Sequence, residues 1–259
     1  MAFTIAFILL VAFALYTLYA TKKKKAEKFP ANWHNKIMRH VNFYKGLSTT
    51  EQKRFQQRIM VFLSEVNIES VGFNLEDLDK ILIACSAVIP VFNFEEWHYK
   101  NLSTVLVYPD HFNENLGFAQ TDENRQIAGM VGTGQFEHQM ILSRKALHGG
   151  FQKKSHIHNT GIHEFVHLID KLDGLTDGVP ETLIQQPYVI PWLKIIHKEM
   201  EDINNNKSDI RNYGGTNEAE FLAVASEYFF EQPEKMKKKH PDLYQMLEVC
   251  FRVKDSSKR

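Results

Sequence analysis

Apolar positions are concentrated at the start of the chain, where the first twenty residues carry no charged side chain and Lys22–Lys25 follow at once. About 20 apolar residues suffice to span a bilayer, and a lysine cluster directly after the span favours keeping that end in the cytoplasm. We therefore predict a transmembrane anchor over residues 1–21, in the bilayer through residues 3–20, followed by a basic linker over residues 22–30. A cleaved signal peptide is the alternative, since Ala12-Phe13-Ala14 resembles a cleavage site, but its basic region would have to precede the apolar run. The prediction is a single-pass protein of the inner or plasma membrane with its main domain in the cytoplasm.

After the linker, apolar and polar positions follow each other mostly with a helical period. The clearest cases predict helices over Thr50–Glu65, Leu75–Ile89, Pro191–Ile203 and Asn217–Glu231. Two short apolar runs, Thr104–Pro109 and His138–Ser143, predict strands. The mixture predicts an α+β fold, mostly helical with a small β-sheet, in one domain over residues 31–255.

Composition narrows the classes of partner. Acidic and basic residues are equal in number, 31 of each, so no global field favours nucleic acid. Cys85 and Cys250 show no C-x-x-C spacing, which indicates buried thiols in a reducing compartment. The basic run Lys235–His240 is either a segment that binds a partner, lipid or nucleic acid, or a solvated helix face, which is the usual role of such a run.

The candidate chemistry lies in the segment "TGIHEFVHLIDKLDG", residues Thr160–Gly174. Its apolar residues recur at helical spacing, so His163 and His167 are predicted to lie one turn apart on one helix face, with Cβ atoms about 6 Å apart. Two imidazoles so placed can bind one metal ion, and Glu164 points about 100° to one side. In a chain with 12 histidines the pattern H-E-x-x-H can also arise by chance, as three polar residues of an ordinary helix.

A catalytic zinc needs a third protein ligand, and the residues alone leave several acids open. Asp173 nearly completes the pattern H-E-x-x-H-x-x-G-x-x-H, but the glycine that turns the chain toward the metal is replaced by Asp170. Either aspartate is more readily an acceptor that fixes a histidine tautomer, or a solvated acid at a helix end. Glu220 and Glu227 lie two turns apart on one face of a predicted helix, and either could reach the metal. The first turn of a helix also favours acids without any metal, because of the helix dipole.

A family resemblance chooses among these acids. The segments "HEFVH" and "LIDKLDG", with "LVYPDHF" upstream and "EAEFLAVASEYFFEQPE" downstream, resemble the Mlc titration factor A family of zinc peptidases over about residues 35–250. The segment "YGGTNEAEF" is also similar to the catalytic domain of anthrax lethal factor, a related gluzincin. The resemblance implies a zincin-like metallopeptidase domain that binds Zn²⁺ through His163, His167 and Glu220. It also implies Tyr213 as an electrophilic helper, where the alternative is a loop tyrosine that packs on the surface.

The predicted function is therefore that of a membrane-anchored zinc peptidase acting on a peptide or protein substrate. Zinc would lower the pKa of a bound water to about 7, and Glu164 would act as general base and then protonate the leaving amine. Zinc and the Tyr213 hydroxyl would stabilise the oxyanion, and the exposed edge of the strand His138–Ser143 would pair with the peptide.

Two alternatives remain open at this point. One is a regulatory protein that binds a transcription factor or another cytosolic partner and has weak or vestigial peptidase activity, as the family name suggests. The other is a structural membrane protein whose histidines merely pack. Metal analysis and peptidase assays separate all three.

Overall fold

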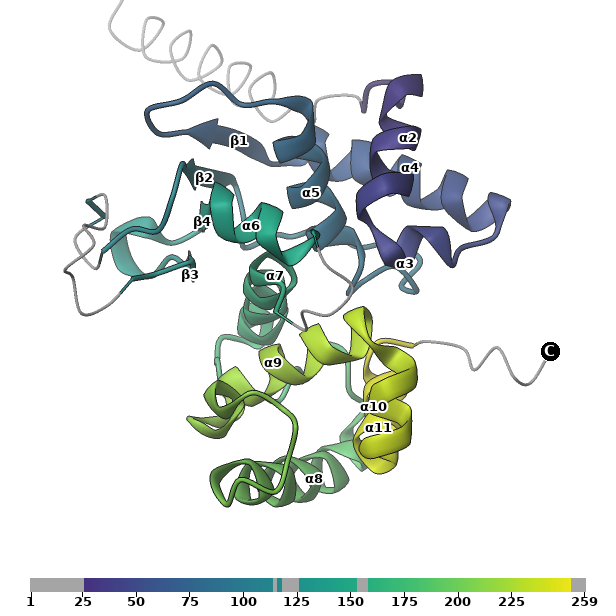
Figure 1. Ribbon diagram of the computed structural model, residues 1–259, viewed down its shortest axis with the longest axis vertical. Coiled ribbons are helices and arrows are strands. Elements are labelled where there is room, and N and C mark those ends of the chain that lie inside the picture. The colour runs from purple at the N-terminus through teal and green to yellow at the C-terminus, as the bar shows by residue number, and fades with distance from the viewer. Residues whose placement is uncertain (1–25, 114–115, 118–125, 153–157, 253–259) are drawn as a thin grey trace, which may run out of the picture.

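The computed structural model describes residues 26–113, 116–117, 126–152 and 158–252 (Figure 1). The predicted anchor and residues 22–25 of the predicted basic linker fall outside these ranges. Within them, every helix is too short or too polar to cross a bilayer. The first described helix begins at Ala31, directly after Pro30.

A four-stranded sheet forms one layer of the fold, in the order β1-β2-β4-β3. Strands β1 (Asn67–Ser70), β2 (Thr104–Tyr108) and β4 (Gln139–Ser143) are parallel, and β3 (Gly129–Val131) pairs antiparallel with β4. The predicted strands correspond to β2 and β4. The prediction that β4 has an exposed edge is wrong, because the segment before it folds back as β3 and covers that edge.

Helix α7 (Thr160–Asp170) lies between two groups of helices (Figure 1). The sheet and α2–α6 lie above it in this view, and α8–α11 lie below. The first group contains α2 (Ala31–His40), α3 (Asn42–Lys45), α4 (Thr49–Glu65), α5 (Asp77–Val88) and α6 (Arg144–Gly150). The second contains α8 (Gln186–Asn204), α9 (Glu218–Glu231), α10 (Pro233–Lys239) and α11 (Pro241–Cys250). Single-turn helices are η1 (Gly134–Phe136), η2 (Lys171–Asp173) and η3 (Asn212–Gly215). The prediction of a mostly helical α+β fold is confirmed.

Apolar burial fixes the position of α7. The helix packs against α5, α9 and strands β3 and β4, and almost all its side chains are buried. Phe165 contacts the aromatic rings of Phe62 and Tyr99, which anchor the helix from the side of α4 and α5. Because this packing holds the helix in place, the directions in which His163, Glu164 and His167 leave it are fixed. Cys85 and Cys250 are both buried free thiols, as predicted.

Candidate metal centre

Helix α7 lies within the segment Thr160–Gly174, which the apolar spacing predicts to be helical. The Asn159 side chain caps it by accepting a hydrogen bond from the backbone N–H of Ile162 at 3.1 Å. The helix ends in the turn η2, and Gly174 follows with φ of +100°, a left-handed conformation that glycine adopts without strain. Both histidines of the motif are thereby held one turn apart on a rigid element.

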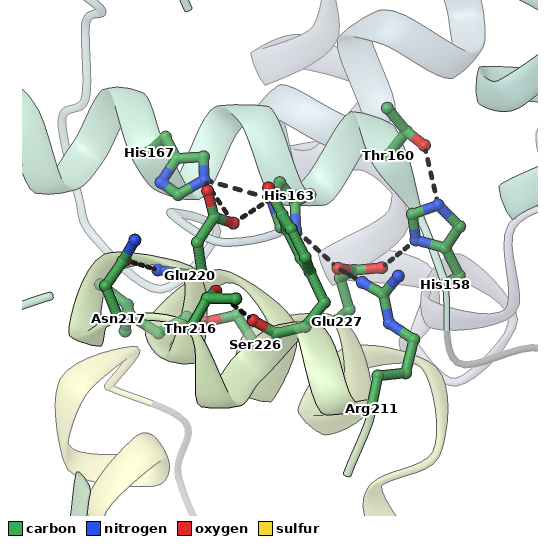
Figure 2. A network of polar contacts seen from close by, with 12 residues as sticks. His158, Thr160, His163, His167, Arg211, Thr216, Asn217, Glu220, Ser226 and Glu227 are labelled. Carbon is green, nitrogen blue, oxygen red and sulfur yellow. Dashed lines mark hydrogen bonds and ion pairs between the residues drawn. The ribbon is translucent and has the colours of Figure 1, made fainter. Parts of the chain in front are cut away.

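Three donor atoms meet in a small triangle (Figure 2). His163 Nε2 lies 3.1 Å from His167 Nε2 and 3.0 Å from Glu220 Oε2, and His167 Nε2 lies 3.4 Å from the same carboxylate oxygen. Bonds of about 2.0–2.1 Å to a tetrahedral zinc require ligand atoms about 3.3 Å apart. The spacing and the N, N, O donor set therefore fit a zinc ion. Within the described ranges, this is the one cluster of histidine, cysteine and acidic side chains that fits a metal.

Helix α9 brings Glu220 to this triangle. Its cap, Asn217, accepts a hydrogen bond from the backbone N–H of Glu220 at 2.9 Å, so the glutamate lies in the first turn. Burial alone would raise the pKa of Glu220, but hydrogen bonds with His163 and His167 outweigh it and hold that pKa well below its ordinary value. The carboxylate is thus in the charged form that a metal requires.

Glu227, two turns further along α9, lies behind the triangle. Its side chain is fully buried, and Oε1 accepts hydrogen bonds from His163 Nδ1 at 2.7 Å and from Arg211 Nη2 at 2.6 Å. Oε2 accepts from His158 Nδ1 at 2.9 Å and from the backbone N–H of Asn159. Burial raises the pKa of Glu227, but these partners outweigh it and lower that pKa to about 2.

This arrangement fixes which ring nitrogen of His163 faces Glu227. An ionised carboxylate only accepts, so Nδ1 must be the donor to Glu227, and Nε2 is the nitrogen that faces the triangle and would give up its proton to bind a metal. An acceptor of this kind was predicted at Asp170 or Asp173, but Glu227 supplies it. Glu227 therefore orients a histidine and does not lie among the three clustered donors.

The two aspartates serve the loop after α7. Asp173 accepts hydrogen bonds from the backbone N–H groups of Leu175 and Glu181, which turns its carboxylate into this loop. Asp170 is buried and accepts from the N–H of Gly178 at 2.9 Å, and burial raises its pKa to about 6. Neither belongs to the donor cluster of the described residues.

Glu164 lies beside the triangle against strand β3. Its side chain is 6% exposed, and burial raises its pKa. A Cβ at Gly129 would lie 2.6 Å from Glu164 Cγ and 2.7 Å from Oε1, so only glycine lets the strand approach this closely. Gly129 was not predicted to belong to the site, although a glycine inside a short strand is a known sign of close approach.

Tyr213, in η3, faces the same centre. It is 49% exposed, and its ring centroid lies 6.0 Å from that of His163. The segment before it is anchored by Asp209, which accepts hydrogen bonds from Tyr228, Lys239 and His240 and forms an ion pair with Lys235. Two lysines of the basic run thus fasten this loop, while the prediction treated the run as a solvated face.

Two pockets meet at Glu164, one on each side of it. The pocket at the start of α7 has a volume of about 240 Å³ and is lined by His158, Thr160, Arg211 and Tyr213 among others. The pocket at the end of α7 has a volume of about 410 Å³ and includes Met130, Val131, Lys171 and Thr176. Gly129, His163 and Glu164 line both. An extended peptide bound along β3 would therefore run from one pocket to the other, past the three clustered donor atoms.

Comparisons with known proteins agree with this chemistry. A family model described as glucose-regulated metallo-peptidase M90 matches residues 17–252. An uncharacterised protein of Synechocystis sp. is 30% identical over 233 residues, which cover 86% of this chain and 84% of that protein. Proteins called Mlc titration factor A are similar at comparable levels. That of Escherichia fergusonii is 31% identical and that of Cronobacter sakazakii 29%, each over 218 residues that cover 77% of this chain and 78% of the relative.

Proposed function

The chain belongs to the glucose-regulated metallo-peptidase M90 family, and we propose that it is a zinc-dependent peptidase whose metal is held by His163, His167 and Glu220. The observation that carries the proposal is the triangle of donor atoms, 3.0–3.4 Å apart, with the Glu164 carboxyl beside it. The family supports a metallopeptidase and hence a metal cofactor. The N, N, O donor set and its spacing favour zinc.

Zinc, when bound, supplies a Lewis acid that makes water a nucleophile near neutral pH. Glu164 would take a proton from the attacking water and pass it to the leaving amine. A general base works best when its pKa is near the operating pH, and burial raises the pKa of Glu164 in that direction. Its position against Gly129 fixes where the proton is received.

The substrate in this proposal is an extended peptide along β3. Ala128 and Gly132 hydrogen-bond to β4, so by alternation the N–H and C=O groups of Gly129 and Val131 point away from the sheet. A peptide backbone can pair with these groups as an added strand. The Tyr213 hydroxyl then donates to the oxyanion that forms at the scissile carbonyl. The peptide thus pairs with β3 in this proposal, and not with β4 as predicted from the sequence.

Two further parts of the proposal concern the setting of the enzyme. The relatives' name states that those proteins titrate Mlc, which supports a regulatory protein as a partner of this chain beside its peptide substrate. We also propose that residues 1–21 anchor the protein in the inner or plasma membrane with the catalytic domain in the cytoplasm. The charge-free run and the lysines that follow it support this topology.

A pair of variants tests the catalytic proposal. Glu164→Gln should keep zinc near the wild-type level but lose at least about 10²-fold in peptide hydrolysis, because only the base is removed. His163→Ala should lose both. Asp173→Asn is the matched control, since this acid of the same motif lies outside the cluster, and it should keep zinc and activity. Normal hydrolysis by the Glu164 variant would refute the assigned base.

A further inference from the structure

The pocket at the start of α7 is lined by two cationic or ionisable side chains that the catalytic proposal does not use. Arg211 is 31% exposed and His158 is 48% exposed, and both line the pocket wall. Among the described residues, Arg211 gives one N–H of its guanidinium to Glu227, out of five such donors. Its Nε is buried, so the other terminal N–H groups are the ones that remain for a bound group.

Both side chains are held in place before any substrate binds. Glu227 accepts from Arg211 through Oε1 and from His158 through Oε2, while the same carboxylate also serves His163 and a backbone N–H. The single Glu227 carboxylate thus accepts hydrogen bonds from four donors. The acid that lines this pocket is Glu164, and it lies against Gly129. Arg211 therefore presents fixed guanidinium donors, which is what binding of a planar carboxylate needs.

The direction of the peptide decides which part of it reaches this pocket. Antiparallel pairing is the commoner arrangement, and Phe112 already pairs antiparallel with Ile127. A peptide antiparallel to β3 has its C-terminal part beside the start of that strand, next to Gln126 and Gly129, which line the same pocket. The Phe112 bridge occupies the strand edge just beyond, so the length of peptide that can pair there is short.

We propose that this pocket binds a carboxylate of the substrate on the C-terminal side of the scissile bond, with Arg211 and His158 as its specificity-determining residues. The inference rests on the proposed peptidase function. The carboxylate has two sources, the free C-terminus of a short leaving fragment or an Asp or Glu side chain just after the cleaved bond. Both present the same planar anion to the guanidinium.

The test uses full-length, zinc-loaded protein and one peptide whose cleavage position is first established by mass spectrometry. Four versions of this peptide are compared by kcat/KM. They carry a free or amidated C-terminus, combined with Glu or Gln directly after the cleaved bond. At least one carboxylate should raise kcat/KM by about 10- to 100-fold over its neutral counterpart, as expected for a charge-assisted hydrogen bond. The version that responds identifies the source.

Variants then assign the preference to the pocket. Because Arg211 also contacts Glu227, the readout is the ratio of rates on charged and neutral peptides, and metal content is measured alongside. Arg211→Gln and His158→Asn should each lower this ratio, toward 1 for Arg211→Gln, and Arg211→Lys should keep part of it. Lys171→Gln, which removes a cation from the other pocket, is the matched control and should leave the ratio unchanged.

The outcomes separate this inference from the proposal on which it rests. Equal rates on all four peptides, or a preference that Arg211→Gln leaves intact, would overturn the carboxylate pocket while the peptidase stands. No hydrolysis of any peptide by zinc-loaded protein would instead overturn the peptidase, and the pocket assignment would fall with it.

Discussion

Replacing Gly129 by alanine would place a methyl group where the Glu164 side chain lies. The new Cβ would be 2.6 Å from Glu164 Cγ and 2.7 Å from Oε1. Non-bonded carbon atoms prefer about 3.5–4.0 Å, so the glutamate side chain has to move by about 1 Å. The atoms that must give way belong to the Glu164 side chain and not to the backbone, so the free energy of unfolding should change little. Catalysis should not be spared, because a displacement of about 1 Å can cost about 10²-fold in rate.

The assay for this prediction combines three measurements on purified Gly129→Ala protein. Bound zinc and the melting temperature should stay near wild type, while kcat/KM for a peptide should fall about 10²-fold. Gly149→Ala is the matched control, because a Cβ there meets no atom within 4 Å, and it should retain full activity. Full hydrolysis by zinc-loaded Gly129→Ala protein would refute the reasoning that Glu164 works from its position against β3.

Three further predictions concern the metal, pH and topology. Glu220→Ala should lose zinc because Glu220 would be a ligand, whereas Glu227→Gln should bind zinc about 10- to 100-fold more weakly because Glu227 orients His163. Chelator competition measures both affinities. A greater loss of zinc in Glu227→Gln than in Glu220→Ala would exchange the two roles. Burial lowers the pKa of His240, but hydrogen bonds with Glu199 and Asp209 outweigh it and raise that pKa. Protonated His240 therefore stabilises the folded protein below about pH 6.5, and this stabilisation is lost as pH rises through the folded-state pKa. In urea unfolding, His240→Asn should therefore cost about 1–3 kcal/mol at about pH 6 and less at about pH 9, and an equal cost at both would contradict the charged pair. A reporter fused after the last residue should be cytoplasmic, and periplasmic or extracellular reporter activity would reject the topology.

The spacing of apolar residues predicted the long helices, because each buries one face, or all of its faces, over many residues. Helices α4, α5, α7 and α9 all lie where apolar spacing indicates them. Strands β1 and β3 were missed, since they have only four and three residues, and none of these seven is fully buried. Because β3 was not predicted, the peptide-binding edge was assigned to β4. The three residues of β3 pair with β4 and make β3 the edge strand of the sheet.

The donor set shows where sequence reasoning stops. Glu220 and Glu227 share a helix face, and only the resemblance chose between them. The structure separates them because the first turn of α9 reaches Nε2 of both histidines, while two turns later the same face reaches Nδ1 of His163. Arg211 and His158 were not predicted at all. They come from loops without periodicity, and their common partner is distant in sequence.

Zinc reconstitution tests the central claim most directly. Full-length protein is stripped with a chelator and titrated with zinc while peptide hydrolysis is followed. If His163, His167 and Glu220 hold a catalytic metal, activity should rise in proportion to zinc and level off at about one ion per chain. Hydrolysis that persists in the metal-free protein, or that fails to return with one bound zinc, would contradict it.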